Sequence, residues 1–187
     1  MGQKHQTLIR YINKERNSDN DTRVCTLYNQ WCYGRMPILS LFKIAKFNKI
    51  NTTDSERNYN SLTDDRNCYI DKIDTIIKLI SADFNTGFLT NYFIFDKDEE
   101  FQPIGALCNN DGYLLIDLTK GNKIHYAFLS GKNNEKVIDG KKYFSDYIES
   151  YKNWENEKEI YEEVQTSLDF IKENCVLMSN EDINNFR

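Results

Sequence analysis

The sequence predicts an α+β fold in which hairpins form an antiparallel sheet and several helices pack on it. Two observations support this class. Short segments of alternating polarity are joined by turn residues, and helical periodicity occurs in separate stretches, not between successive strands. The chain has 187 residues, of which 40% are hydrophobic, and this is enough to bury one good core.

The first predicted elements are two strands joined as a hairpin. Residues 7–14 and 22–28 alternate well enough for strands, and residues 15–21 between them are rich in Asn, Ser and Asp, which favour turns. Arg10 and Arg23 fall on strand positions that we expect to be exposed.

A helix is predicted after Gly34, with Pro37 in its first turn, where the missing N–H costs nothing. Its apolar residues recur at helical spacing, and its lysines form a basic stripe at intervals of three. The lysines are Lys43, Lys46 and Lys49.

The later chain contains more strands and then helices. Residues 51–68 lack periodicity and predict a loop, and the isoleucines of 70–80 predict an amphipathic helix. We further expect strands at 88–95, 103–107, 112–118 and 123–129, turns at 110–112 and 120–122, helices near 143–153 and 155–174, and a polar tail at 179–187.

The charge of the chain is divided unevenly. Residues 1–50 hold nine Lys and Arg against three acids, which is a net charge of +6. Because the net charge of the whole chain is −5, residues 51–187 carry a net charge of −11. We interpret 1–50 as a basic hairpin and helix, and 51–187 as an acidic α+β body that packs with it as one unit. Such asymmetry is typical of a protein whose basic end meets a polyanion.

The five cysteines predict reduced thiols in an intracellular protein. Their number is odd, they are widely spaced, and they form no CxxC pair. A zinc site of Cys25, Cys32 and His5 is conceivable, but we favour buried structural cysteines, without metal or cofactor. A signal region and an 18-residue apolar stretch are both lacking, so we expect a cytoplasmic protein that is not in a membrane.

Two short runs are candidate RNA contacts. In the run that includes Gln3, Lys4, His5 and Gln6, the lysine can meet a phosphate, and the other side chains can bind base edges or 2′-hydroxyls. A solvated, frayed terminus is the alternative.

The second run combines Trp31, Tyr33 and Arg35, which could stack on unpaired bases. For Trp31 we favour a core anchor, with Gly34 supplying a turn.

The charged stretches leave two alternatives open. Beside the hairpin arginines, Lys43 and Lys46 would form a phosphate-tracking surface, and otherwise they are an ordinary solvated helix face. The acidic stretches 96–100 and 155–163 would be solvated faces, or would dock onto basic tails of ribosomal proteins.

Catalytic motifs are lacking, because the chain has no P-loop, GxSxG, HExxH or GxGxxG. His125 lies in a predicted strand, where a core or sheet-face histidine is the favoured interpretation. We therefore expect that the protein is not an enzyme.

The opening Gly2-Gln3-Lys4-His5-Gln6, the basic hairpin and Gln30-Trp31-Cys32-Tyr33-Gly34 together resemble a known family. They are similar to the microsporidian dormancy factors, ribosome-hibernation proteins related to a largely fungal, eukaryotic family that opens with a GxKHQ-like sequence. The resemblance covers about thirty-five of the 187 residues. It implies a monomer that binds the 80S ribosome in the tRNA exit site (E-site), near the L1 stalk, and prevents tRNA from binding there. We expect neither a membrane nor DNA as a partner.

The family motif and the basic hairpin and helix together define the expected ribosome-contact set. Its members are Gly2, Gln3, Lys4, His5, Gln6, Arg10, Arg23, Trp31, Tyr33, Gly34, Arg35, Lys43 and Lys46.

Two other classes of function stay open. Residues 101–151 look loosely similar to the SMI1/KNR4 adaptor superfamily, although most of the glycines expected before its central strands are missing. An unrecognised enzyme or thiol-metal protein is the third possibility.

Overall fold

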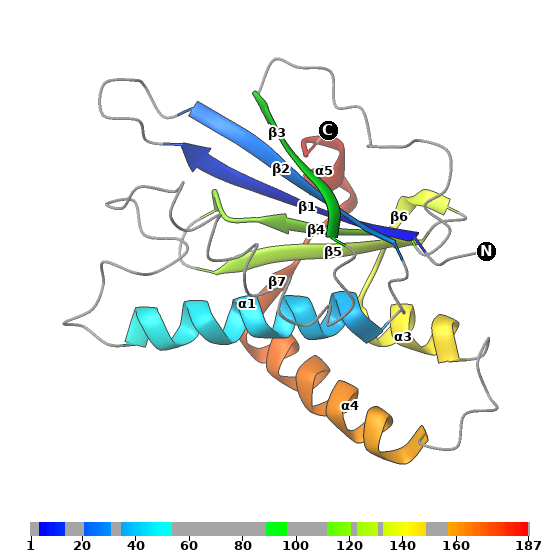
Figure 1. The fold of residues 1–187 in the computed structure, drawn as a ribbon. Helices are drawn as coiled ribbons and strands as arrows, with labels where there is room; N and C mark the ends of the chain where they lie inside the picture. Colours follow the sequence, from blue (N-terminus) through cyan, green and yellow to red (C-terminus); the bar gives the residue numbers. More distant parts are fainter. Residues whose placement is uncertain are drawn as a thin grey trace.

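The computed structural model describes residues 4–13, 21–30, 35–53, 89–96, 112–120, 123–130, 133–148 and 157–186. These residues form a mostly antiparallel sheet with helices on both of its faces, which confirms the α+β class (Figure 1). The expected helix at 70–80, the strand at 103–107 and the turn at 15–20 lie outside the described residues.

The predicted hairpin is confirmed and is longer than expected. Strands β1 (Lys4–Asn13) and β2 (Asp21–Gln30) pair antiparallel along their whole length, from Lys4 opposite Gln30 to Asn13 opposite Asp21. β3 (Leu89–Asp96) adds antiparallel to β2.

The middle of the sheet contains a parallel pair that the hairpin pattern did not predict. β4 (Tyr113–Asp117) lies between β1, to which it is parallel, and β5 (Ile124–Ser130), to which it is antiparallel. Both edges of β4 are therefore occupied, by β1 and β5. Of the expected turn at 110–112, only Gly112 lies within the described residues. Gly112 adopts φ 87°, a conformation that favours glycine, and its carbonyl accepts a hydrogen bond from Gln6 N.

The outer edge of β5 is divided between two strands that local periodicity missed. β6 (Asn133–Ile138) pairs with the end of β5, and β7 (Cys175–Leu177) pairs parallel with its beginning. The sheet order is thus β3-β2-β1-β4-β5-β6, with β7 beside β5.

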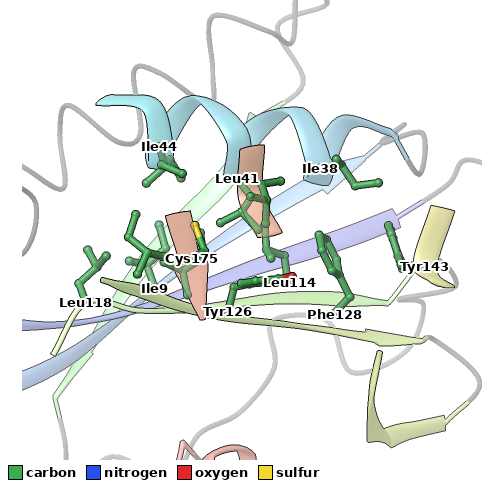
Figure 2. Packing of buried hydrophobic residues seen from close by; sticks show 14 of the residues in the cluster. Ile9, Ile38, Leu41, Ile44, Leu114, Leu118, Tyr126, Phe128, Tyr143 and Cys175 are labelled. Carbon is green, nitrogen blue, oxygen red and sulfur yellow. The ribbon is translucent and has the colours of Figure 1, made fainter. Parts of the chain in front are cut away.

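One face of the sheet is covered by α1 (Arg35–Thr53), α3 (Gly140–Ile148) and α4 (Glu157–Asn174) (Figure 1). Pro37 lies in the first turn of α1, as predicted. Ile38, Leu41 and Ile44 point from α1 onto the sheet, and all three are fully buried (Figure 2). Residues from both sides of position 50, such as Ile9 and Phe128, belong to this same core.

The opposite face is covered by α5 (Asn180–Asn184), which replaces the expected polar tail. Ser179 accepts a hydrogen bond from Asp182 N, and the Asp182 carboxylate accepts from Ser179 N, so the helix starts with a capping box. Ile183 and Phe186 are almost fully buried against Leu8 and Leu115. The expectation of a tail was wrong because two apolar residues at helical spacing are enough to dock so short a helix.

Candidate functional site

The hairpin register brings the two family-like runs to the same end of the sheet. Lys4 is the first residue of β1 and lies opposite Gln30, the last residue of β2. Chain segments that flank a register pair must leave the sheet at the same end. Lys4 of the first family-like run therefore lies beside Gln30 of the second run. Gly2, Gln3, Trp31, Tyr33 and Gly34 lie outside the described residues, and Arg35 opens α1.

His5 and Gln6 do not lie on a projecting terminus, and that expectation is wrong. Both side chains are 0% exposed. The reason is their place in β1, which lies between β2 and β4 and carries helices on both faces. Neither side chain is accessible to RNA in this fold.

The His5 ring is an unusual buried group. It packs edge-on against Tyr143 of α3, with 6.3 Å between the ring centroids. Among the residues that the structure describes, neither ring nitrogen has a hydrogen-bond partner, and burial lowers the pKa of His5 to about 3. His5 is therefore neutral at physiological pH and acts as a packing residue.

Arg10 was expected to face solvent on the hairpin, and this expectation is also wrong. Its Nη2 donates to Asp117 Oδ2 at 2.5 Å, and its Nη1 donates to the carbonyl of Asn185 at 2.7 Å. The guanidinium also lies 4.6 Å above the ring of Phe186. Arg10 is thus bound to β4 and to the C-terminal segment, because the parallel β1–β4 pairing places Asp117 beside it.

Asp117 is the partner that sequence reasoning missed. Its side chain is 1% exposed, and its Oδ1 accepts hydrogen bonds from the amide and hydroxyl of Thr119. Burial raises the pKa of Asp117, but the hydrogen bonds from Arg10 and Thr119 outweigh this effect and hold the pKa below its usual value. The sequence signal for this pair was an acid within the apolar run Tyr113–Leu118, since a carboxylate in a buried strand requires a hydrogen-bond or ion-pair partner.

The expected phosphate-tracking surface does not form from these cations. Arg10 faces α5, whereas α1, which carries Lys43 and Lys46, covers the other face of the sheet. Lys43 lines a groove with Glu162 and Glu163 of α4, where a phosphate would meet two carboxylates. Lys46 is exposed, with its Nζ 5.8 Å from the Phe42 ring centroid.

Arg23 lies on a different face of the hairpin from Arg10. It lies opposite Tyr11 in the β1–β2 register, and Tyr11 packs in the core beneath α1. Because directly paired residues in a sheet share a face, Arg23 belongs to the α1 side. The two hairpin arginines therefore cannot serve one common surface.

The described cysteines are buried thiols. Cys25 and Cys175 are both buried, and burial raises the pKa of Cys175 to about 12. Cys25 pairs with Ile9, four positions along β1 from His5, which is a separation of about 13 Å at the rise of a strand. This register keeps Cys25 and His5 too far apart for the zinc site that the sequence allowed. Cys32 lies outside the described residues.

His125 lies in β5, as predicted for a sheet-face histidine. It lies opposite Asp117 in the β4–β5 register, and its buried Nδ1 has no hydrogen-bond partner in the described part of the chain. Within the ranges that the structure describes, no group of three or more His, Cys, Asp or Glu residues is arranged to hold a metal ion. None of the described helices is both long and apolar enough to cross a membrane.

Comparison of the chain with protein-family models, curated proteins and solved structures finds no match.

Proposed function

We propose that this protein is a ribosome-binding dormancy factor of the type represented by microsporidian dormancy factor one. In this proposal, its basic end occupies the tRNA exit site of the 80S ribosome and holds the ribosome inactive in the cytoplasm. The observation that carries the proposal is the register of Lys4 with Gln30, which joins the two family-like runs at one end of the sheet.

The charge of the chain supports residues 1–50 as the segment that makes the contact. Residues 1–50 carry a net charge of +6, whereas residues 51–187 carry a net charge of −11, which together give the −5 of the whole chain. A chain that is acidic overall is repelled by phosphate, so it would bind a composite site of rRNA and protein with only its basic end inserted.

The burial of His5 and Gln6, the ion pair of Arg10 and the two carboxylates beside Lys43 narrow the proposed contact set. What stays in it are the residues that flank the register pair, namely Gly2, Gln3, Lys4, Trp31, Tyr33, Gly34 and Arg35, together with Arg23 and the exposed Lys46. The proposed mechanism is steric occupancy of the pocket for the tRNA 3′ end, and it requires no chemistry by the protein.

Co-sedimentation with purified 80S ribosomes tests the proposal. The informative variants are a deletion of residues 2–3 combined with Lys4→Glu, and the pair Trp31→Ala and Tyr33→Ala. His5 and Gln6 are left in place because removing two buried strand residues would damage the fold. The matched control is Lys172→Glu, which makes the same charge reversal in the last turn of α4.

We expect the wild-type protein and the Lys172→Glu control to migrate with monosomes and the other variants to be lost from them. Contact with four to six phosphates would give log K a slope of roughly −3 to −5 against log salt. Wild-type protein that stays at the top of the gradient contradicts the proposal. Variants that bind as well as the wild-type protein contradict the assignment of the contact to this end.

A protein-adaptor role is the second candidate, favoured by the exposed α4 surface with Tyr161, Glu162 and Glu163. The segment that suggested the SMI1/KNR4 resemblance does not itself form that surface. Tyr113–Asp117 is the fully buried strand β4. Recovery of a protein partner without rRNA would favour this role over ribosome binding.

A further inference from the structure

A groove between α1 and α4 is the cavity that the ribosome proposal does not use. Its volume is about 450 Å³. From α1 it is lined by Leu39, Phe42 and Lys43. From α4 it is lined by Glu162, Glu163, Thr166 and Ser167.

The α1 side supplies an apolar surface. Leu39 and Phe42 are both half-buried, so each keeps part of its side chain accessible. The Phe42 ring packs against Phe170 of α4 in an edge-on contact, with 5.2 Å between the ring centroids. A ring fixed in this way presents a pre-formed apolar surface, and binding to it costs little side-chain ordering.

The α4 side presents hydrogen-bond acceptors. Glu162 and Glu163 are exposed carboxylates. The Thr166 hydroxyl donates to the Glu162 carbonyl, and the Ser167 hydroxyl donates to the Glu163 carbonyl. With their protons already used, these hydroxyls can only accept further hydrogen bonds. A ligand that satisfies this side must therefore be a donor, and a positive charge would be stabilised.

The charge on the α4 side of the groove is negative, whereas α1 contributes Lys43 to the lining and the exposed Lys46 beside Phe42. On α4 from residue 161 to 173, the exposed charged residues are Glu162, Glu163, Asp169, Lys172 and Glu173, so four acids face one base. Tyr161, next to Glu162, is 51% exposed, and tyrosine is enriched at the energetic centres of protein interfaces.

We propose that the α1–α4 groove is a docking site for a segment of a partner protein that carries Lys or Arg beside a large apolar side chain. The apolar side chain would pack on Leu39 and Phe42, and the cation would pair with Glu162 and Glu163. A peptide segment suits a groove with one apolar and one acidic side, because it can bring an apolar anchor and a cation together. The site is independent of ribosome contact through Lys4 and Gln30.

Fluorescence anisotropy with labelled twelve-residue peptides tests the proposal on the full chain. The probe is a peptide with alternating Lys and Leu residues, and its comparison peptides replace every Leu by Ser or every Lys by Glu. The test variants are Glu162→Gln with Glu163→Gln, and separately Leu39→Asn. The matched control is Glu173→Gln with Glu181→Gln, which removes the same charge from the far end of α4 and from α5.

We expect the first double variant to bind the Lys/Leu probe about five- to tenfold more weakly, the magnitude of two partly exposed ion pairs. Leu39→Asn should weaken the Lys/Leu probe but not the Lys/Ser peptide. The control should change binding less than twofold, and circular dichroism should show that all variants are folded.

Two results would overturn the proposal. One is the absence of saturable binding of the Lys/Leu probe to the wild-type protein. The other is an equal loss of affinity in the groove variant and the control, which would assign the binding to overall charge. Neither result bears on ribosome co-sedimentation, so the two proposals can fail separately.

Discussion

Arg10 and Asp117 form an ion pair inside the sheet, with 2.5 Å between Nη2 and Oδ2, although 107 residues separate them in the chain. The pair joins the parallel strands β1 and β4. Its guanidinium also holds the carbonyl of Asn185 and the ring of Phe186, so the same side chain attaches the C-terminal segment to the sheet. The pair therefore connects the first strand of the chain to its last turn.

Replacing Arg10 by Met should destabilise the protein by about 3–5 kcal/mol, because the Asp117 carboxylate would remain buried without its cation. Urea unfolding measures the loss. Lys46→Met is the matched control, since this exposed cation has only a long contact with Phe42, and we expect a change within ~0.5 kcal/mol. A double-mutant cycle with Asp117→Leu should recover much of the cost, and additive losses would contradict the coupling.

The Asp117 carboxylate also predicts a response to acid. Because its folded pKa lies below the unfolded value, its contribution to stability is present above the unfolded pKa and is lost as pH falls through the folded pKa. In Asp117→Asn this acid-dependent part of the unfolding free energy should disappear. If the unfolding free energies of the wild-type protein and Asp117→Asn fall equally as the pH is lowered below 4, the prediction is contradicted.

His5 should make the protein less stable at mildly acidic pH. Its folded pKa is about 3, against an ordinary value of 6.5, so below 6.5 the unfolded state binds a proton that the folded state excludes. Lowering the pH from 7.5 to 5.0 should cost about 2 kcal/mol through this group alone. His5→Phe keeps a ring against Tyr143 and cannot titrate, so its urea midpoint should be less sensitive over this range. An unchanged pH dependence in His5→Phe would refute the prediction.

The capping box at α5 should contribute measurably to stability. Ser179→Ala removes the acceptor for Asp182 N at the start of the helix and should cost about 0.5–2 kcal/mol. Thr166→Ala is the control, because this exposed hydroxyl donates only to a carbonyl of its own helix. The thermal unfolding midpoint should fall for Ser179→Ala and stay near the wild-type value for Thr166→Ala. Equal shifts would show that the cap has no special role.

Gly140 lies where α3 approaches α4, and an added Cβ would be 2.5 Å from Leu168 Cδ2 and 3.4 Å from Phe128 Cε2. Gly140→Ala should therefore cost about 1–2 kcal/mol, since overpacking outweighs the gain in helix propensity. In a Leu168→Ala background the clash is gone, so the same substitution should become neutral or stabilising. Denaturant unfolding of the four proteins measures the coupling, and equal effects of Gly140→Ala in both backgrounds would exclude the clash.

Local pattern predicted the elements whose apolar periodicity is strong. The alternation of residues 7–14 and 22–28 predicted β1 and β2, and Ile38 and Leu41 at helical spacing predicted the buried face of α1. It missed β7 and α5, because three and five residues are too short to show a period. It also missed β6, in which four polar residues precede Val137 and Ile138. The Ser179 and Asp182 capping pair was the sequence signal that could have located α5.

The candidate site was less predictable than the fold. His5, Gln6 and Arg10 are polar residues near the start of a basic segment, and nothing local distinguishes them from solvent-facing residues. The parallel pairing of β1 with β4 places Gln6 and Arg10 inside the assembled sheet, and Tyr143 of α3 packs on His5. These contacts join segments about a hundred residues or more apart. The groove between α1 and α4 was likewise unpredictable, because it exists only where two separate helices meet.

The sequence by itself determined the charge division of the chain, the strands of the hairpin and the helix that follows it, because these depend on neighbouring residues. Only the tertiary structure decided which polar side chains remain available to a partner. Arg10 forms an ion pair with Asp117, His5 is buried with its ring against Tyr143, and Lys43 lines a groove together with two glutamates. The physical reason is that burial and ion pairing depend on contacts between distant segments, and these contacts arise only when the sheet assembles.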